Sequence, residues 1–124
     1  MWLHSVVSSL RQNCKMKVNF KEMEAATIPH FKGGEGDFIA KMHTDDLNKI
    51  INGRLQPGCT IGLHTHETNS EIIFIVSGTA DFIYDDGTET VEAGNCHYCP
   101  KGHSHSMINN GTEDIVFYAV VPEH

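Results

Sequence analysis

Two histidines separated by a single residue, His64 and His66, are placed to share one ligand. In an extended chain, residues i and i+2 point to the same face and lie about 7 Å apart along the strand. Two imidazoles at that separation can lean toward one ion. Glu71 opens the β-branched and aromatic run 72–76, so a short turn can return its carboxylate to the same point.

A second block, residues 94–109, carries Pro100, Gly102 and His105. With His105 included, three imidazoles and one carboxylate form a borderline-hard ligand set that suits Fe, Mn, Ni, Co or Zn. Four protein ligands leave up to two positions of an octahedron open, which favours a reactive or binding site over a closed structural one. We therefore expect one divalent transition metal per chain.

Glycine, proline and asparagine stand at regular offsets in both blocks. The first reads Gly58-x5-His64-x-His66-x4-Glu71-x6-Gly78, and the second reads Gly94-x5-Pro100-x-Gly102-x2-His105-x3-Asn109. Both patterns match the two motifs of the cupin family in full, so the chain resembles a small single-domain cupin of the kind labelled oxalate-decarboxylase-like. The resemblance implies a double-stranded β-helix, or jelly-roll barrel, and assigns the metal-ligand role to His64, His66, Glu71 and His105.

The rest of the chain also favours an all-β domain, because short apolar segments alternate with turns rich in Gly, Pro and Asp. We expect one cupin domain over 16–124, with motif one at 58–78 and motif two at 94–109. The predicted strands are 37–43, 49–55, 71–77, 79–84, 88–91, 95–99, 105–108 and 115–121, preceded by an edge strand at 16–20 and a helical turn at 22–26. Within 71–77, Ile73 and Ile75 share the face of Glu71, which predicts that this face is the barrel interior.

We expect no signal peptide in residues 1–15, because no basic segment opens them and polar residues interrupt their apolar content. We expect an extension that is either disordered or precedes a natural start at Met16. Four cysteines without a secretory signal predict free thiols and a cytoplasmic location. Cys96 and Cys99, three apart on a predicted strand, should point to opposite faces and serve as packed side chains, not as a zinc or redox pair.

The formal net charge is −7, from 9 basic and 16 acidic side chains. This acidic balance argues against nucleic acid or an anionic membrane as a partner, and no stretch of about 18 apolar residues exists to span a bilayer. A small molecule is the expected partner. The outer face of residues 72–76 is apolar and must be covered by the N-terminal segment or a second subunit, so we expect a homodimer.

Proton transfer at the site needs a titratable side chain, and the candidates are His103, Tyr84 and Tyr98. His97 lies on a predicted strand where either face is open to it. Side chains on the ligand-facing strands either line the pocket or form plain core: Ile73, Phe82, Tyr84, Met107 and Phe117.

Cupin oxalate decarboxylases place an arginine three residues before the first motif histidine, and Ile61 stands there in this sequence. Arg54 or Lys41 would have to substitute for it. We expect a metal-dependent enzyme, an oxygenase, decarboxylase, lyase or isomerase, acting on a small polar or carboxylate-bearing molecule. The alternative is a metal-dependent module that binds or senses a small ligand without catalysis.

Overall fold

The computed structural model describes residues 16–124, where nearly every regular element is a strand. In chain order the elements are η1 (Phe20–Glu22), β1 (Ala26–Pro29), η2 (Phe31–Gly33), β2 (Asp37–Thr44), β3 (Asn48–Leu55), β4 (Thr60–Thr65), β5 (Glu71–Ser77), β6 (Thr79–Tyr84), β7 (Gly87–Glu92), β8 (Cys96–Cys99), β9 (Ser104–Ile108) and β10 (Ile115–Pro122). The predicted all-β class is confirmed. The extension predicted for residues 1–15 lies outside the described part of the chain. No helix within 16–124 is long and apolar enough to cross a membrane.

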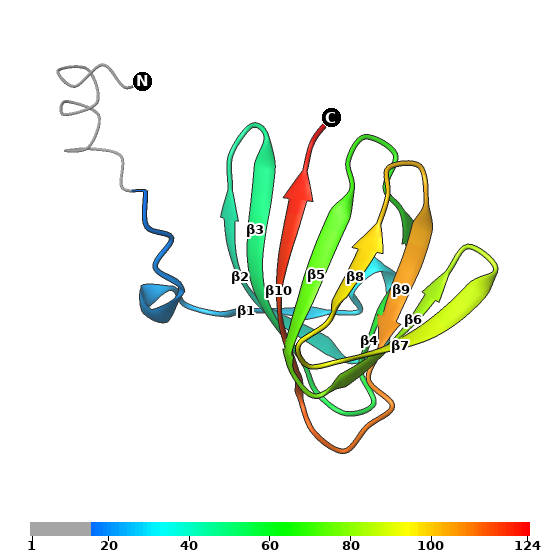
Figure 1. The fold of residues 1–124 in the computed structure, drawn as a ribbon. Coiled ribbons are helices and arrows are strands. Elements are labelled where there is room, and N and C mark those ends of the chain that lie inside the picture. The colour runs from blue at the N-terminus through cyan, green and yellow to red at the C-terminus, as the bar shows by residue number, and fades with distance from the viewer. Residues whose placement is uncertain (1–15) are drawn as a thin grey trace, which may run out of the picture.

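The strands form two antiparallel sheets. One has six strands in the order β1-β2-β3-β10-β5-β8, and the other has four in the order β4-β9-β6-β7 (Figure 1). Neighbours along the chain often lie in different sheets, since β4 and β5, or β7 and β8, follow each other across the barrel. This winding is the predicted double-stranded β-helix.

The core lies between the two sheets. Strand β5 alternates as expected, because Glu71, Ile73 and Ile75 are buried while Phe74 and Val76 are each 51% exposed. Within the core, the rings of Phe38 on β2 and Phe117 on β10, two strands of the larger sheet, stack with centroids 5.9 Å apart.

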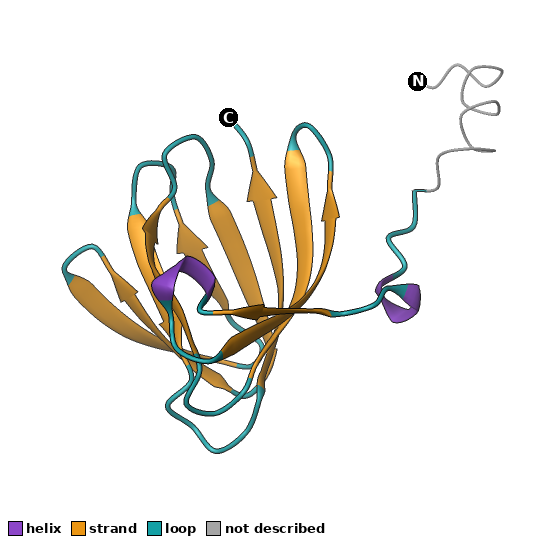
Figure 2. Cartoon of the chain, turned by 180° about the vertical axis from the view of Figure 1, so that it is seen from behind, coloured by secondary structure: helices purple, strands orange, loops and turns teal. Residues whose placement is uncertain are grey.

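The N-terminal part differs from the prediction. Residues 16–20 form no strand, and the predicted helical turn at 22–26 is replaced by η1 followed by strand β1. Strand β1 pairs antiparallel with β2, with Thr27 opposite Ile39. Pairing to a neighbouring strand outweighs the local preference, and Pro29 is tolerated because β1 is an edge strand. Figure 2 shows η1 on the N-terminal arm and η2 lying over the strands.

Candidate metal centre

Three strands carry the predicted ligands to one end of the barrel. Strands β4 and β9 pair antiparallel, with His64 opposite His105, and a register shift between Ile61 and His64 marks a bulge. Such bulges re-aim side chains next to functional sites. His66 lies just past β4, where its backbone N–H donates to the carbonyl oxygen of His103 at 3.0 Å. Glu71 is the first residue of β5.

The four side chains converge. The three imidazole centroids of His64, His66 and His105 lie 4.7 to 5.0 Å apart. Nε2 of His66 is 3.0 Å from Nε2 of His105, and Oε1 of Glu71 lies 3.2 and 3.0 Å from these two nitrogens. One ligand atom from each of the four residues lies within 4.8 Å of all the others, so the cluster is capable of holding a metal.

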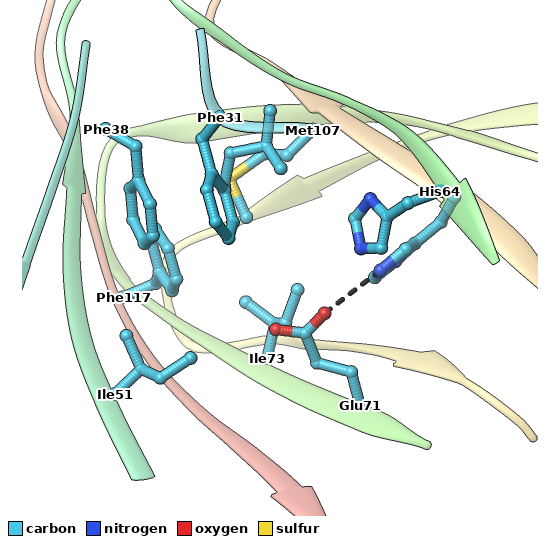
Figure 3. A pocket seen from close by; sticks show the side chains of 10 residues that line it. Phe31, Phe38, Ile51, His64, Glu71, Ile73, Met107 and Phe117 are labelled. Carbon is cyan, nitrogen blue, oxygen red and sulfur yellow. Dashed lines mark ion pairs between the residues drawn. The ribbon is translucent and has the colours of Figure 1, made fainter. Parts of the chain in front are cut away.

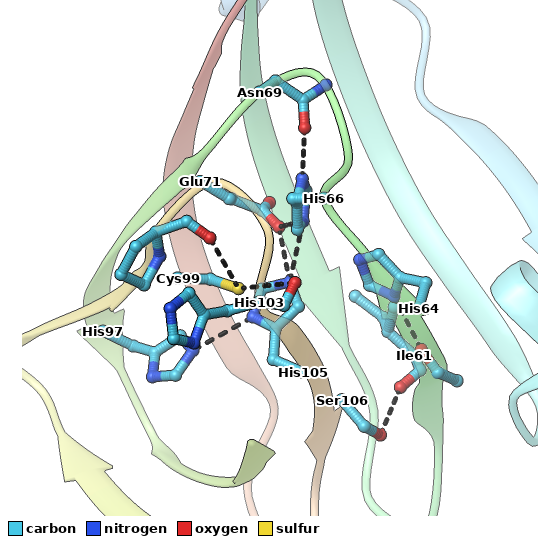
Figure 4. A network of polar contacts seen from close by, with 12 residues as sticks. Ile61, His64, His66, Asn69, Glu71, His97, Cys99, His103, His105 and Ser106 are labelled. Atoms are coloured by element: carbon cyan, nitrogen blue, oxygen red, sulfur yellow. Dashed lines mark hydrogen bonds and ion pairs between the residues drawn. The ribbon is translucent and has the colours of Figure 1, made fainter. Parts of the chain in front are cut away.

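The second ring nitrogen of two histidines is engaged away from the cluster (Figure 4). Nδ1 of His64 is 2.7 Å from the carbonyl oxygen of Gly62, and Nδ1 of His66 is 2.5 Å from Oδ1 of Asn69. Both partners are acceptors, so each Nδ1 carries a hydrogen and donates it. A neutral ring then keeps its lone pair on Nε2, the atom available to a metal.

Electrostatics at the cluster favour an ionised carboxylate. Burial raises the pKa of Glu71, but hydrogen bonds from His105 and His66 outweigh it and lower the pKa to about 2. Burial lowers the pKa of His64, whereas the hydrogen bond to Glu71 raises the pKa of His66. Metal binding needs a carboxylate and neutral imidazoles, so a proton on His66 is the competitor for the site.

A cavity and a pocket adjoin the cluster. The inner cavity, of about 30 Å³, is mainly apolar (Figure 3), and its lining includes the predicted residues Ile73, Met107 and Phe117. The outer pocket is larger, at about 330 Å³, and Lys32, Lys49 and Glu67 line it beside the ligand residues.

Other predicted site residues lie elsewhere. The proton-transfer candidates His103, Tyr84 and Tyr98 all line a separate pocket of about 180 Å³. Nδ1 of His103 donates to Asp85 at 2.7 Å, and the His103 side chain is 51% exposed. Phe82 is fully buried and faces a histidine ring of the core.

The suggested substitutes for the missing arginine lie outside the site. Arg54 forms an ion pair with Asp114 at 2.7 Å, and Arg54 and Lys41 line a groove formed by β2, β3 and β10. Ile61 is buried and lines the inner cavity.

Among the described cysteines, Cys59, Cys96 and Cys99 have free thiols, as predicted. Cys96 is exposed and Cys99 is buried, so the two thiols point to opposite faces. Only Cys99 is a buried side chain, so the prediction that both are packed was wrong for Cys96. Burial raises the pKa of the Cys99 thiol to about 11.

Two lysines that line the outer pocket were missed by the sequence analysis, and the facing of a third residue, His97, was left open. Lys49 shares the strand face of the buried Ile51, a parity that could have placed it in the pocket. The position of Lys32 depends on the conformation of a loop, in which its φ is 56°, and no local sequence pattern predicts that conformation. His97 is 2% exposed and touches His105, with Nε2 at 3.0 Å from Nδ1 of that ligand histidine. The sequence did not determine which face of its strand the His97 side chain occupies.

Comparison with known proteins decides the family. A cupin-domain family model matches residues 53–121, more than half of the chain. The chain is a cupin. This cupin is 31% identical over 120 residues to an oxalate-binding protein from Thermotoga maritima, covering 90% of this chain and 98% of that protein. An auxin-binding protein from Prunus persica is 37% identical over 62 residues, which are 46% of this cupin but only 30% of that protein.

Solved structures agree with this assignment. A predicted oxalate decarboxylase from Thermotoga maritima superposes with a TM-score of 0.83 and 28% identity, covering 88% of this cupin and all 100% of that chain. The cupin domain of Cnp3 from Schizosaccharomyces pombe, at 12% identity, has a TM-score of 0.70 over 88% of this cupin and 70% of that chain. The second likeness shows the fold alone.

Proposed function

We propose that this cupin binds one divalent transition metal through His64, His66, Glu71 and His105, and that the ion and the outer pocket together hold a small carboxylate of the oxalate type. The observation that carries the proposal is the convergence of the ligand atoms. Around an octahedral ion with bonds of about 2.1 Å, adjacent ligand atoms lie about 3.0 Å apart. The separations of 3.0 to 3.2 Å among His66, His105 and Glu71 match that spacing.

Charge in the outer pocket supports an anionic ligand. The chain has an excess of acidic side chains, yet Lys32 and Lys49 both line this pocket, with Glu67 as its further acidic group beside the ligand Glu71. Lysine ammonium groups attract carboxylates and can supply the positive charge that a guanidinium would otherwise supply. The 31% identity to an oxalate-binding protein over nearly its whole length points to the same ligand class.

The metal ion, the two lysines and the inner cavity would each have a separate role in binding a carboxylate. A bound ion would supply Lewis-acid polarisation of a carboxylate placed on its open positions. Lys32 and Lys49 would neutralise the remaining charge, and the apolar inner cavity, of about 30 Å³, would limit water behind the ligand. A volume near that of one water leaves the outer pocket, of about 330 Å³, as the place for the ligand itself.

Binding without turnover is the function favoured by the placement of the titratable side chains. His103, Tyr84 and Tyr98 gather in the separate pocket of about 180 Å³ and do not line the outer pocket. Any proton transfer to a bound carboxylate would fall to Lys32, Lys49 or Glu67, the titratable side chains that line the outer pocket beside the metal-binding residues.

Isothermal titration of metal-loaded and chelator-treated protein with oxalate tests this function. We expect oxalate to bind only the loaded protein, and neutral oxamide to bind far more weakly. Lys32→Ala should weaken oxalate binding about tenfold, the effect of losing about 1.4 kcal/mol. Lys41→Ala, which removes a lysine from the groove formed by β2, β3 and β10, is the matched control and should leave oxalate binding unchanged. Equal binding to chelator-treated protein, or to oxamide, would contradict the proposal.

A further inference from the structure

His97 is a buried polar side chain that is not one of the four predicted metal ligands, yet it contacts one of them, His105. It stands on β8, where it pairs with Ile73 of β5, and it is 2% exposed. Its ring stacks on Phe82 with centroids 3.7 Å apart and an interplanar angle of 9°. This stacking holds the plane of the imidazole and leaves its two nitrogens at the edges.

Both nitrogens of His97 are occupied. Nδ1 lies 2.6 Å from Oε1 of Glu89, on β7, and Nε2 lies 3.0 Å from Nδ1 of His105 (Figure 4 shows the contact with His105). A carboxylate only accepts, so Nδ1 of His97 donates to Glu89. The contact between Nε2 of His97 and Nδ1 of His105 needs a hydrogen on one of these two nitrogens, and a neutral His105 ring that holds a metal through Nε2 carries that hydrogen on Nδ1.

The donor and the acceptor are then assigned for both hydrogen bonds, from Glu89 to His97 and from His97 to His105. Nε2 of His97 accepts, so Nδ1 of His105 donates to it. In the metal-bound protein, His105 would therefore carry its hydrogen on Nδ1 and present the lone pair of Nε2, the atom that lies 3.0 Å from Glu71 and from His66. Glu89 and His97 thus provide an acceptor for the Nδ1 hydrogen of His105, as the Gly62 carbonyl does for that of His64.

We propose that Glu89 and His97 are positioning residues that fix the tautomer and orientation of His105 and thereby set the affinity of the site for its metal. This inference rests on the proposed metal site. Hydrogen-bond partners of metal-bound histidines typically contribute about 10-fold to 100-fold in metal affinity. The Glu89 side chain is 42% exposed and lines the separate pocket of about 180 Å³, so the series of hydrogen bonds runs from the predicted ligand His105 to that pocket.

A second histidine–carboxylate pair in the molecule provides a matched comparison. His103 donates from Nδ1 to Asp85 at 2.7 Å, nearly the same contact as the 2.6 Å one between His97 and Glu89. The difference lies at the other nitrogen, because only His97 hydrogen-bonds to a predicted metal ligand through its side chain.

Metal affinity measured by competition with a chromophoric chelator tests the inference. His97→Phe keeps a ring to stack on Phe82 but removes the acceptor, and we expect its metal Kd to rise about 10-fold to 100-fold. His97→Gln offers an amide oxygen to His105 and should recover much of the loss. Asp85→Ala should leave the Kd unchanged, while Glu89→Ala should raise it. The Tm of His97→Phe in excess chelator should stay close to that of the wild type, which separates positioning from a purely structural role.

A second readout is the tautomer itself. Long-range proton–nitrogen correlation spectra of the zinc-loaded protein should show hydrogens on Nδ1 of both His97 and His105. A His97→Phe Kd within about threefold of wild type, or a hydrogen on Nε2 of His97, would overturn the inference. If His97→Phe does not fold, Glu89→Ala and His97→Gln decide by the same criterion. Wild-type protein that binds no metal would instead refute the proposed function.

Discussion

At the scale of single residues, the chemistry of the centre depends on which nitrogen of each imidazole is free. Gly62 and Asn69 accept from Nδ1 of His64 and His66, so each of those rings offers Nε2. Asn69 is held in turn, because its amide nitrogen donates to Glu123 at 2.5 Å. A ligand set prepared by such partners needs little reorganisation when an ion arrives.

Metal affinity should fall as the pH falls. The hydrogen bond to Glu71 raises the pKa of His66, so protein stripped by a chelator takes up a proton there above the usual range of histidine. Below that pKa the metal must displace a proton, and its apparent Kd should rise by up to about tenfold per pH unit for each proton displaced. Chelator competition between about pH 8 and about pH 6 measures this. A Kd that stays constant or tightens toward acid would contradict the expected competition.

The sequence spacing predicted the ligand cluster but not its supporting residues. The spacing of His64, His66 and Glu71 fits a strand and a turn, whereas the ligand role of the distant His105 followed from the resemblance to the two cupin motifs. The contact of Glu89 with His97 depends on which strands pair across the barrel. Glu89 and His97 lie eight positions apart in sequence, and no periodicity connects them.

At the scale of elements, the loop that carries η2 lies against β4 through two glycines. A Cβ on Gly34 would lie 2.2 Å from the carbonyl oxygen of Thr60, and a Cβ on Gly62 would lie 2.0 Å from that of Lys32. The loop is further held by His30, whose Nδ1 donates to the carbonyl oxygen of Gly34 at 3.0 Å. This close contact brings Lys32 to the outer pocket.

Gly34→Ala should therefore separate ligand binding from metal binding. The added methyl group meets backbone atoms and must push the loop off β4, at a cost of about 1–3 kcal/mol in the free energy of unfolding. We expect weaker oxalate binding by titration calorimetry with metal content retained, because no ligand residue lies on the loop. Gly111→Ala is a control for the added methyl group alone, since Gly111 is not among the glycines with positive φ and its Cβ would meet only Oδ1 of Asn109, at 3.4 Å. Loss of metal together with oxalate binding would show that the loop supports the ligands themselves.

The strands of the domain were easier to predict than its N-terminal elements. Alternation along β5 placed Glu71, Ile73 and Ile75 inside, because a half-buried strand has a period of two. Strand β1 carries no such alternation over its four residues, and its pairing with β2 decides its conformation. Loop geometry such as the positive φ of Lys32 likewise follows from packing on β4, which a local sequence does not contain.

At the scale of the whole molecule, the outer face of the larger sheet is unusually apolar. Phe74 and Val76 on β5 are 51% exposed, and Tyr118 on β10 and Tyr98 on β8 are 42% and 57% exposed. Cross-strand pairing puts Phe74 beside Tyr118 on this face. The N-terminal segment covers part of it, because the Phe20 ring lies 5.7 Å from that of Tyr118.

We propose that a second copy of the chain covers the remainder, giving a homodimer. Light scattering coupled to size exclusion should give about twice the 13.8 kDa of one chain. Phe74→Lys should shift the protein to the monomer, because a charge at the centre of an apolar interface is costly to bury. Leu47→Lys changes an exposed leucine on the β2–β3 turn and should leave the dimer intact. A wild-type monomer, or a dimer unaffected by Phe74→Lys, would refute this interface.

The most direct test of the central claim is metal analysis of protein purified without a histidine tag, alongside its His105→Ala variant. His105 supplies one of the four ligands, and its Nε2 lies 3.0 Å from both His66 and Glu71. We expect about one divalent transition metal per wild-type chain and a marked loss in the variant, with the β-sheet circular dichroism of both proteins alike. Equal metal content in the two proteins, or none in a wild type reconstituted with Fe, Mn, Ni, Co or Zn, would contradict it.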